Sequence, residues 1–434
     1  MSIRQFTSQA VWALPVALAL AMPLGGLAQS LAAAPLPAAT PRAGPISLQQ
    51  ALDAARANAQ ARLSQQALAA ARSDILAADR PPLPVFSAKA NPTDSTGPGG
   101  STQTRYDASL GVDWTIERGD KRAHRTAAAR FGAQAAQSEL AETLLQQQLL
   151  VKDQYFDLLA AQERLGHLQA IAQAAQQTAD AAALRFKAGD LSAQDRVRVE
   201  IEAERARSDQ AKARAEVQRG AAALAQALGW PASSAAMLSA RAEWPVQGVD
   251  MLARTASLEN WMAVRPDVQA YELRTQAAQA YLDNARALGK IDPTVGLSVD
   301  SSGSSSRRLA ELRVQFPLQR SSTYDGEIGR AMAQLEQAQT QTEQVRLAAQ
   351  TQWQVMRDDY ANALARHQRY VSDILPRAQQ VAAQAEFAYG KGAIALVDLL
   401  DARRTLKLSL LEALDVQAEF AKAFVALQLR SSKP

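Results

Sequence analysis

Hydrophobic residues recur along this chain with two different spacings, one typical of helices and one typical of strands. The helical spacing predicts helices at about 47–79, 121–187, 191–228, 251–289, 325–389 (kinked at Pro376) and 394–430. The range 121–187 contains no proline and would be about 100 Å long at 1.5 Å per residue. A helical pattern of this length without a break predicts a coiled coil.

Strict alternation of apolar and polar residues predicts four strands. The clearest is 105–116, in which Tyr106, Leu110 and Trp114 share one face with other apolar residues, while polar residues such as Asp113 occupy the other. The remaining strands are predicted at about 84–90, 293–300 and 308–316. The segments that join them, 91–102 and 301–307, consist largely of turn-forming residues.

The order helix–strand–strand–helix occurs twice, in residues 46–230 and 251–434, with a connecting segment at 231–250. In the first half, the two shorter helices together match the length of the long helix. They would therefore lie end to end beside it. Each half is predicted to be a rod with two strands at one end and a helical hairpin at the other.

The two hairpins turn at corresponding sequences, FKAGDLSAQD (186–195) and YGKGAIALVD (389–398). Each has a glycine directly after a helical pattern and an aspartate six residues later. Gly189 and Gly392 fit the positive-φ position that ends a helix and closes a hairpin.

Composition refines this picture. The chain is 47% hydrophobic but only 5% aromatic, and alanine is by far the commonest apolar residue, which favours thin, closely packed helix layers. The net charge of +4 is close to balance and argues against a nucleic-acid binder. There is no cysteine, which excludes disulfides, thiolate metal sites and an acylated lipid anchor.

No enzyme, metal site or cofactor is predicted. His124, His167 and His367 are isolated in the sequence, with no metal-ligand spacing around them. Neither a phosphate-binding loop nor a nucleophile motif is found.

The N-terminus resembles an export signal. Residues 1–28 combine a short basic start at Arg4, an apolar stretch at 11–24 and small residues at 26–28. The apolar stretch is too short for a membrane anchor and contains two prolines. Residues 29–45 are rich in proline and alanine and are interpreted as a leader segment.

In an exported protein, strands with one apolar face are typical of the outer membrane. Four strands cannot close a barrel, and open sheet edges do not occur in lipid. Several chains would therefore share one barrel. A small soluble sheet at the end of a coiled-coil rod is the alternative.

These features together resemble the TolC family of outer-membrane efflux channels, over about 46–430. The two hairpin turns and the duplicated order of elements carry the resemblance. The segment IERGDKRAHRTAAAR (116–130) is most similar to the heavy-metal-efflux branch, and ILPRAQQ (374–380) is found widely in the family.

The resemblance implies a mainly α fold with a small β part, assembled as a homotrimer. A periplasmic α-barrel of coiled coils would continue into a 12-strand outer-membrane β-barrel, surrounded by outer-membrane lipid. It also implies docking to a periplasmic adaptor (membrane fusion protein) and an inner-membrane RND-type pump, and passive conduction. The expected location is the cell outer membrane, with a long periplasmic portion.

The resemblance also assigns roles to residues at the tips. Gly189 and Gly392 would form the turns that contact the adaptor. Asp398 and Asp401 match aspartates that line the periplasmic entrance, where threefold symmetry would make two acidic rings that favour cations.

Asp195 and Tyr389 match positions that bond to each other and hold the closed gate. A well-studied member of the family has an arginine where this chain has Ile394. The prediction is therefore a gate held by fewer bonds between helices.

Lys121, Arg122 and Arg125 crowd the start of a long helix, against the helix dipole. External anionic groups near the membrane rim, or solvent alone, would compensate them.

Two other functions stay open from the sequence: the outer-membrane channel of a type I secretion system, and a non-channel coiled-coil protein such as the periplasmic adaptor itself. An adaptor normally has one helical hairpin flanked by β-rich domains, whereas this chain has two hairpins and four short strands.

Overall fold

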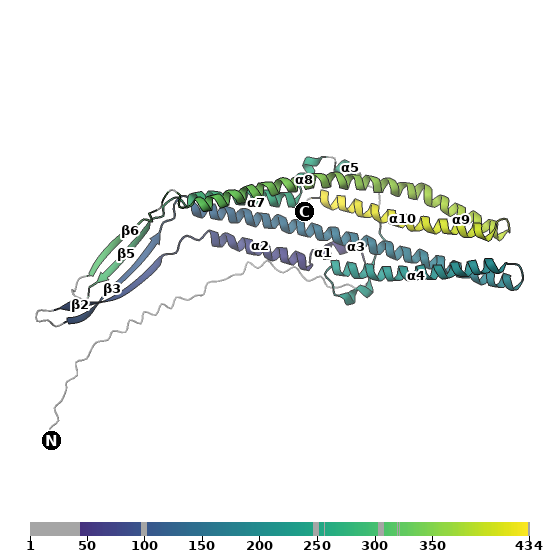
Figure 1. The fold of residues 1–434 in the computed structure, drawn as a ribbon, viewed down its shortest axis with the longest axis horizontal. Helices are drawn as coiled ribbons and strands as arrows, with labels where there is room; N and C mark the ends of the chain where they lie inside the picture. Colours follow the sequence, from purple (N-terminus) through teal and green to yellow (C-terminus); the bar gives the residue numbers. More distant parts are fainter. Residues whose placement is uncertain are drawn as a thin grey trace, which may run out of the picture.

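The computed structural model describes residues 44–96, 102–245, 251–255, 257–302, 308–318, 320 and 322–432. The predicted signal peptide and nearly all of the leader lie outside these residues and stay predictions. The chain is a long rod, with strands at one end and the turns of two helical hairpins at the other (Figure 1).

The first half is built on one helix of 67 residues, α3. Helices α2 and α4 lie end to end beside it (Figure 1). The bounds are α1 Leu48–Ala55, α2 Ala59–Ala78, α3 Lys121–Lys187 and α4 Ala193–Ala227. The predicted helix 47–79 is thus broken in two, because Asn58 caps α2 by accepting a hydrogen bond from the N–H of Ala61 (2.9 Å).

The connecting segment holds a 3₁₀ helix, η1 Ala232–Met237, and the short strand β4 Leu238–Ala240. The second half follows as α5 Met251–Arg254, α6 Leu258–Ala263, α7 Pro266–Ala287, α8 Asp325–Arg369, α9 Leu375–Gly390 and α10 Leu396–Ser431. The predicted helix 251–289 is therefore three helices. Pro266 begins the third, where its missing N–H costs no hydrogen bond.

The kink predicted at Pro376 takes the form of a π-helical turn, η2 Tyr370–Ile374, between α8 and α9. Proline lacks the N–H that the preceding turn needs, so the backbone hydrogen bonds there span five residues instead of four.

Four antiparallel strands form one sheet in the order β2-β3-β5-β6. Their bounds are β2 Val85–Thr96, β3 Thr102–Thr115, β5 Thr294–Ser301 and β6 Arg308–Gln315. Strands β2 and β3 extend farther than the expected ranges, and β2 includes Pro92. An edge strand tolerates proline, because its outer N–H groups need no partner in the sheet.

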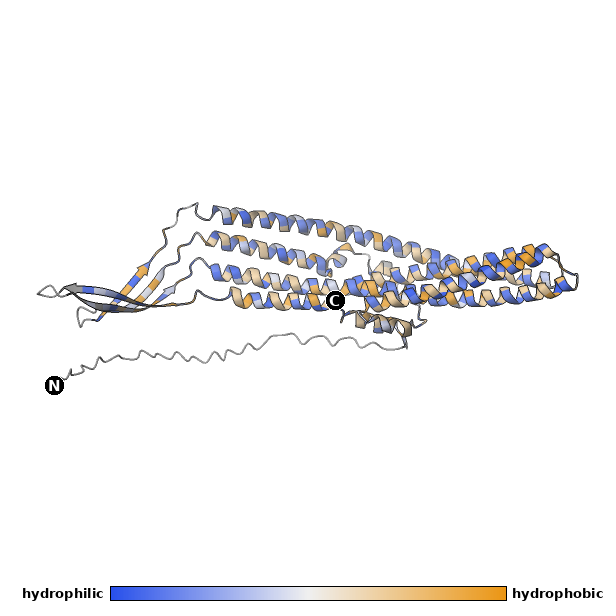
Figure 2. Ribbon diagram, turned by 60° about the horizontal axis from the view of Figure 1, so that its bottom comes forward, coloured by the Kyte–Doolittle hydropathy of each residue, from blue (hydrophilic) through white to orange (hydrophobic). Residues whose placement is uncertain are grey.

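The apolar side chains of this sheet are exposed. Tyr106, Leu110, Leu297 and Leu312 are each more than half exposed, and the alternation of apolar and polar residues is visible along the strands (Figure 2). No described element covers this face. A single chain therefore exposes an apolar surface and two unpaired sheet edges.

The main core lies at the middle of the rod. Phe156 stacks on Trp244 with 5.8 Å between ring centroids, and Tyr155, Leu224 and Leu427 are fully buried in the same cluster. Toward both ends, alanine occupies most of the buried helix positions, which lets the helices approach closely.

A short parallel pairing of β1 (Gly44–Ile46) with β4 holds the start of the described chain against this core. The Tyr155 hydroxyl lies 2.9 Å from the carbonyl oxygen of Arg241 and 3.3 Å from that of Ile46. Burial raises the pKa of Tyr155 to about 12, so the hydroxyl keeps its proton and donates to these strands at neutral pH.

Candidate functional site: the hairpin tips

The first tip joins α3 to α4 at Gly189. The N–H of Gly189 donates to the carbonyl of Phe186 (3.0 Å), and the N–H of Asp190 donates to that of Arg185 (2.9 Å). These are the two bonds of a Schellman cap, which needs a left-handed residue. Gly189 supplies it with a φ of +82°.

The second tip joins α9 to α10 at Gly392 with the same bonds. Gly392 donates to Tyr389 and Ala393 donates to Ala388, both at 2.9 Å, and Gly392 has a φ of +73°. Open space surrounds both glycines where a Cβ would stand. The backbone angle, and not crowding, selects glycine at both tips.

Asp195 and Asp398 occupy equivalent places, the third residue of the helix that follows each turn. Asp195 accepts a hydrogen bond from the Ser192 hydroxyl (2.8 Å), and its own N–H donates to Ser192 Oγ (3.0 Å). Asp398 accepts from the N–H of Ala395 (3.2 Å). Both carboxylates therefore stabilise the start of their own helix.

Tyr389 lies between the two hairpins. Its hydroxyl accepts a hydrogen bond from Arg185 Nη1 (3.1 Å), and the Arg185 guanidinium carbon is 5.9 Å from the centre of its ring. Within one chain, Tyr389 thus contacts α3 through Arg185, and Asp195 bonds to Ser192 instead of to Tyr389. Asp401 and Asp398 are exposed on the first turns of α10.

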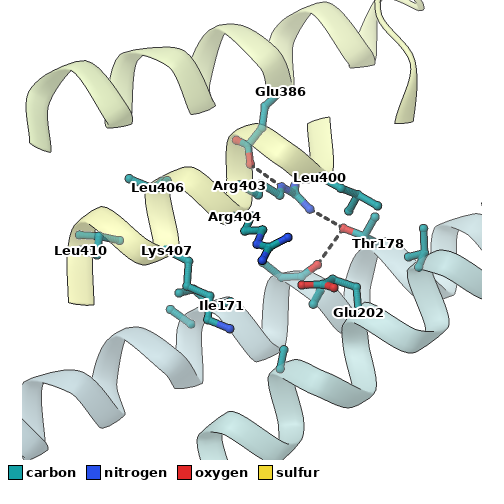
Figure 3. A pocket seen from close by; sticks show the side chains of 15 residues that line it. Ile171, Thr178, Glu202, Glu386, Leu400, Arg403, Arg404, Leu406, Lys407 and Leu410 are labelled. Atoms are coloured by element: carbon teal, nitrogen blue, oxygen red, sulfur yellow. Dashed lines mark hydrogen bonds and ion pairs between the residues drawn. The ribbon is translucent and has the colours of Figure 1, made fainter. Parts of the chain in front are cut away.

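Further bonds join the hairpins above the tips. Arg403 on α10 donates to Glu386 of α9 (3.0 Å) and to the Thr178 hydroxyl of α3 (2.8 Å). Lys407 forms an ion pair with Asp209 of α4. Arg403, Glu386, Thr178 and Lys407 line a cavity of ≈ 250 Å³ between the hairpins, and most of its other walls are aliphatic side chains (Figure 3).

Sequence reasoning did not identify this group. Arg403 and Thr178 are 225 residues apart, and no local pattern pairs them. The duplicated order of elements was the only indication in the sequence, because it places the two hairpins at the same end of the rod.

The basic residues at the start of α3 have partners inside the chain, so the prediction of external compensation was wrong. Lys121 bonds to Asp292 and to the carbonyl of Lys290, both at 2.7 Å. Arg122 pairs with Asp79 (3.1 Å), and Arg125 pairs with Glu117. The ends of both halves converge here, which brings these carboxylates to the helix start.

On the polar face of the sheet, Arg313 of β6 donates to Asp113 of β3 (2.8 Å). Gly296 of β5 lies between them, and this ion pair crosses above it. Among the described residues, no three His, Asp or Glu side chains gather closely enough to hold a metal ion. None of the described helices combines the length and apolar character that crossing a bilayer requires.

A duplicated rod with an apolar-faced sheet at one end and two hairpin tips at the other defines the outer-membrane channel class of fold. Several solved structures share this fold. VceC of Vibrio cholerae, an outer membrane protein, superposes with a TM-score of 0.74 at 16% identity, over 88% of this chain and 95% of VceC. CusC superposes with a TM-score of 0.65 at 19% identity, over 93% of this chain and 98% of CusC.

The chain belongs to the outer membrane efflux protein family, whose model matches residues 47–230 and 258–430. A relative is the cobalt-zinc-cadmium resistance protein CzcC of Cupriavidus metallidurans. It is 26% identical over 398 residues, which are 91% of this chain and 92% of CzcC. The family resemblance stated from the sequence is thereby confirmed, and so is the expected mainly α fold with a small β part, while the trimer and the closed barrel stay predictions.

Proposed function

We propose that three copies of this chain form the outer-membrane channel of a tripartite efflux system. The channel passively conducts solutes that an inner-membrane RND-type pump and a periplasmic adaptor deliver, and it has no catalytic role. The solutes are divalent metal cations.

The exposed apolar face of the four-strand sheet carries this proposal. Strands β2 and β6 each leave one edge unpaired in a single chain, and such edges are not stable in lipid. Barrels of this kind have at least about eight strands. Three chains would contribute twelve strands, and each edge β2 would pair with an edge β6 of the next copy.

The tips support the proposed adaptor contact. Both turns are exposed at the end of the rod opposite the sheet (Figure 1). Open space surrounds the point where a Cβ would stand on each tip glycine, so another protein could approach the backbone closely there.

The proposed cargo rests on the resistance that gives CzcC its name, and on the acidic side chains at the second tip. If Asp398 and Asp401 face the mouth of a trimer, they would favour cations.

A deletion strain tests the function. Loss of the gene should lower tolerance to cobalt, zinc and cadmium by severalfold, and the cloned gene should restore it. Sensitivity to hydrophobic drugs with unchanged metal tolerance would contradict the metal assignment. Loss of secretion of a protein substrate, with metal tolerance and drug tolerance both unchanged, would favour a type I secretion channel.

Two variants use the same complementation assay to test whether the apolar face of the four-strand sheet contacts lipid. Leu110→Arg places a charge on the apolar face, and Ser109→Arg places one on the polar face of the same strand. Complementation and outer-membrane recovery should fail for the first and persist for the second. Recovery of the wild-type protein only in the soluble periplasm would overturn the channel proposal.

A further inference from the structure

Four connections join the sheet to the helices, and all four repeat one short pattern. They are residues 79–84, 116–120, 288–293 and 316–324. Each contains a single basic residue, which is exposed, and an exposed apolar residue lies close to it on the strand side. In chain order, the pairs are Arg80 with Leu83, Arg118 with Ile116, Lys290 with Ile291, and Arg320 with Leu318. We call the four basic residues the basic belt.

The register of the sheet places the four connections at one level. Thr115 at the end of β3 pairs with Thr294 of β5, and Thr294 pairs with Gln315 at the end of β6. Val85, the first residue of β2, pairs with Asp113, two positions from the end of β3, which is about 7 Å along a strand. The connections therefore leave the sheet together, where the strands meet the helices (Figure 1).

The basic belt has no anionic partner in the described part of the chain. No ion pair or side-chain hydrogen bond joins any of its four side chains to another described residue. The cations at the start of α3 already pair with the nearby carboxylates Asp79, Glu117 and Asp292. Asp120 is the one other carboxylate in the four connections. The two carboxylates in the first turn of α8 lie on the helix side of Arg320, where the helix dipole stabilises them.

On its other side, the basic belt borders the apolar face of the sheet. Phe86, Trp114 and Phe316 lie near this end of the apolar face, and each is at least 45% exposed. Leu83 and Leu318, closer to the belt, are 76% and 100% exposed. Aromatic side chains are typical of outer-membrane strands at the boundary between lipid and water. The order from apolar face to aromatic rings to cations matches that from acyl chain to phosphate in a phospholipid.

We propose that the basic belt binds the headgroups of anionic phospholipids, such as phosphatidylglycerol, in the inner leaflet of the outer membrane. This inference rests on the proposed trimer and its placement in that membrane. Four belt residues from each of three copies would surround the barrel with twelve cations. Guanidinium and ammonium groups both donate hydrogen bonds to phosphate oxygens. Each cation beside an anionic headgroup adds about fivefold to its affinity, so the belt selects anionic over zwitterionic lipid.

Trp114 gives a direct readout of the lipid beside the belt. Of the tryptophans in the sequence, it alone belongs to the four strands and their connections. Phospholipids with brominated acyl chains quench a tryptophan that they contact. In trimers reconstituted into bilayers, brominated phosphatidylglycerol should compete for the site next to Trp114 about fivefold better than brominated phosphatidylcholine.

A variant without the belt charges tests the assignment. Its preference for phosphatidylglycerol should fall to about one, while quenching by phosphatidylcholine persists. It combines Arg80→Gln, Arg118→Gln, Lys290→Gln and Arg320→Gln. Lysine at the three arginine positions should keep the preference. The matched control removes four exposed cations from helices away from the sheet and should also keep it. The control combines Arg56→Gln, Arg62→Gln, Lys212→Gln and Arg214→Gln. If the belt variant does not assemble, Arg118→Gln alone should at least halve the preference, because Arg118 is four residues from Trp114.

Equal quenching of the wild type by the two lipids, or an equal loss of preference in the control, would overturn the belt and leave the channel proposal intact. Inorganic phosphate should weaken the preference no more than chloride at the same ionic strength. A loss with phosphate alone would show that the belt takes free anions and not lipid. Absence of quenching by either lipid would overturn the membrane placement of the sheet together with the belt.

Discussion

Gly296 shows how a residue without a side chain can position two others. A Cβ built on Gly296 would lie 2.2 Å from Asp113 Oδ1, so any larger residue displaces the carboxylate that Arg313 binds. The alternation in β3 predicted that Asp113 lies on the polar face. It could not identify Arg313, because that residue is 200 positions away in the sequence. The two side chains come together only because β5 pairs with both β3 and β6 in the sheet.

We expect Gly296→Ala to lower the unfolding temperature of the protein in detergent. The new methyl group would push Asp113 away from Arg313 and break the ion pair. Circular dichroism during heating measures the change. Gly132→Ala in α3 is the control, because it meets open space and should stabilise the helix by about 0.5–1 kcal/mol. Equal unfolding temperatures for Gly296→Ala and the wild type would show that the carboxylate adapts without cost.

At the scale of elements, the break between α1 and α2 marks the limit of periodicity. The pattern from 47 to 79 is helical throughout and contains neither glycine nor proline. The helix breaks because Asn58 caps α2 and also donates its side-chain amide to Gln147 of α3 (2.5 Å). The capping preference of asparagine was visible in the sequence, but the contact with Gln147, which fixes the break, depends on the tertiary fold.

Asn58→Ala should lower the free energy of unfolding by about 1–2 kcal/mol, the usual cost of losing a cap. The same substitution removes the hydrogen bond from the buried Asn58 side chain to Gln147, which adds to this cost. Urea unfolding followed at 222 nm measures it. Ser73→Ala on the exposed side of the same helix should change stability by less than about 0.5 kcal/mol. A similar small change for Asn58→Ala would show that the break does not depend on its cap.

At the scale of the whole molecule, a buried ion pair connects the two halves. Arg430, at the end of α10, makes two hydrogen bonds to Glu142 of α3 (2.8 and 2.9 Å). Arg265 binds Asp267 at the start of α7 (2.5 and 2.9 Å), and Arg430 also lowers the pKa of Asp267. The repeat in the sequence predicted two parallel rods. It gave no indication of the pair of Arg430 and Glu142, whose members belong to opposite halves, or of the contact of Arg265 with Asp267.

Asp267 makes stability depend on pH. Burial alone would raise its pKa, but the hydrogen bonds and charge of Arg265 outweigh burial and lower the pKa below the ordinary 3.8. A lowered pKa means that the folded state holds the ionised form, so this stabilisation is present at neutral pH and is lost as pH falls below about 4. Asp267→Asn should therefore be less stable than the wild type at pH 7, and the difference should shrink toward pH 3.

Unfolding midpoints measured from pH 7 to pH 3 check this expectation, with Asp74→Asn on the exposed side of α2 as the control. A gap between Asp267→Asn and the wild type that stays constant over this range would contradict the role assigned to the carboxylate.

The pairing of β1 with β4 sets an order of events during biogenesis. Ile46 has its strand partner in Ala240, so nearly the whole first half must be synthesised before the pair can form. The Tyr155 hydroxyl, which bridges both strands, likewise waits for Arg241. Contacts between distant residues close slowly. The earliest synthesised part of the rod is therefore among the last to reach its final place, and the central core stays open on that side until the connecting segment has been made.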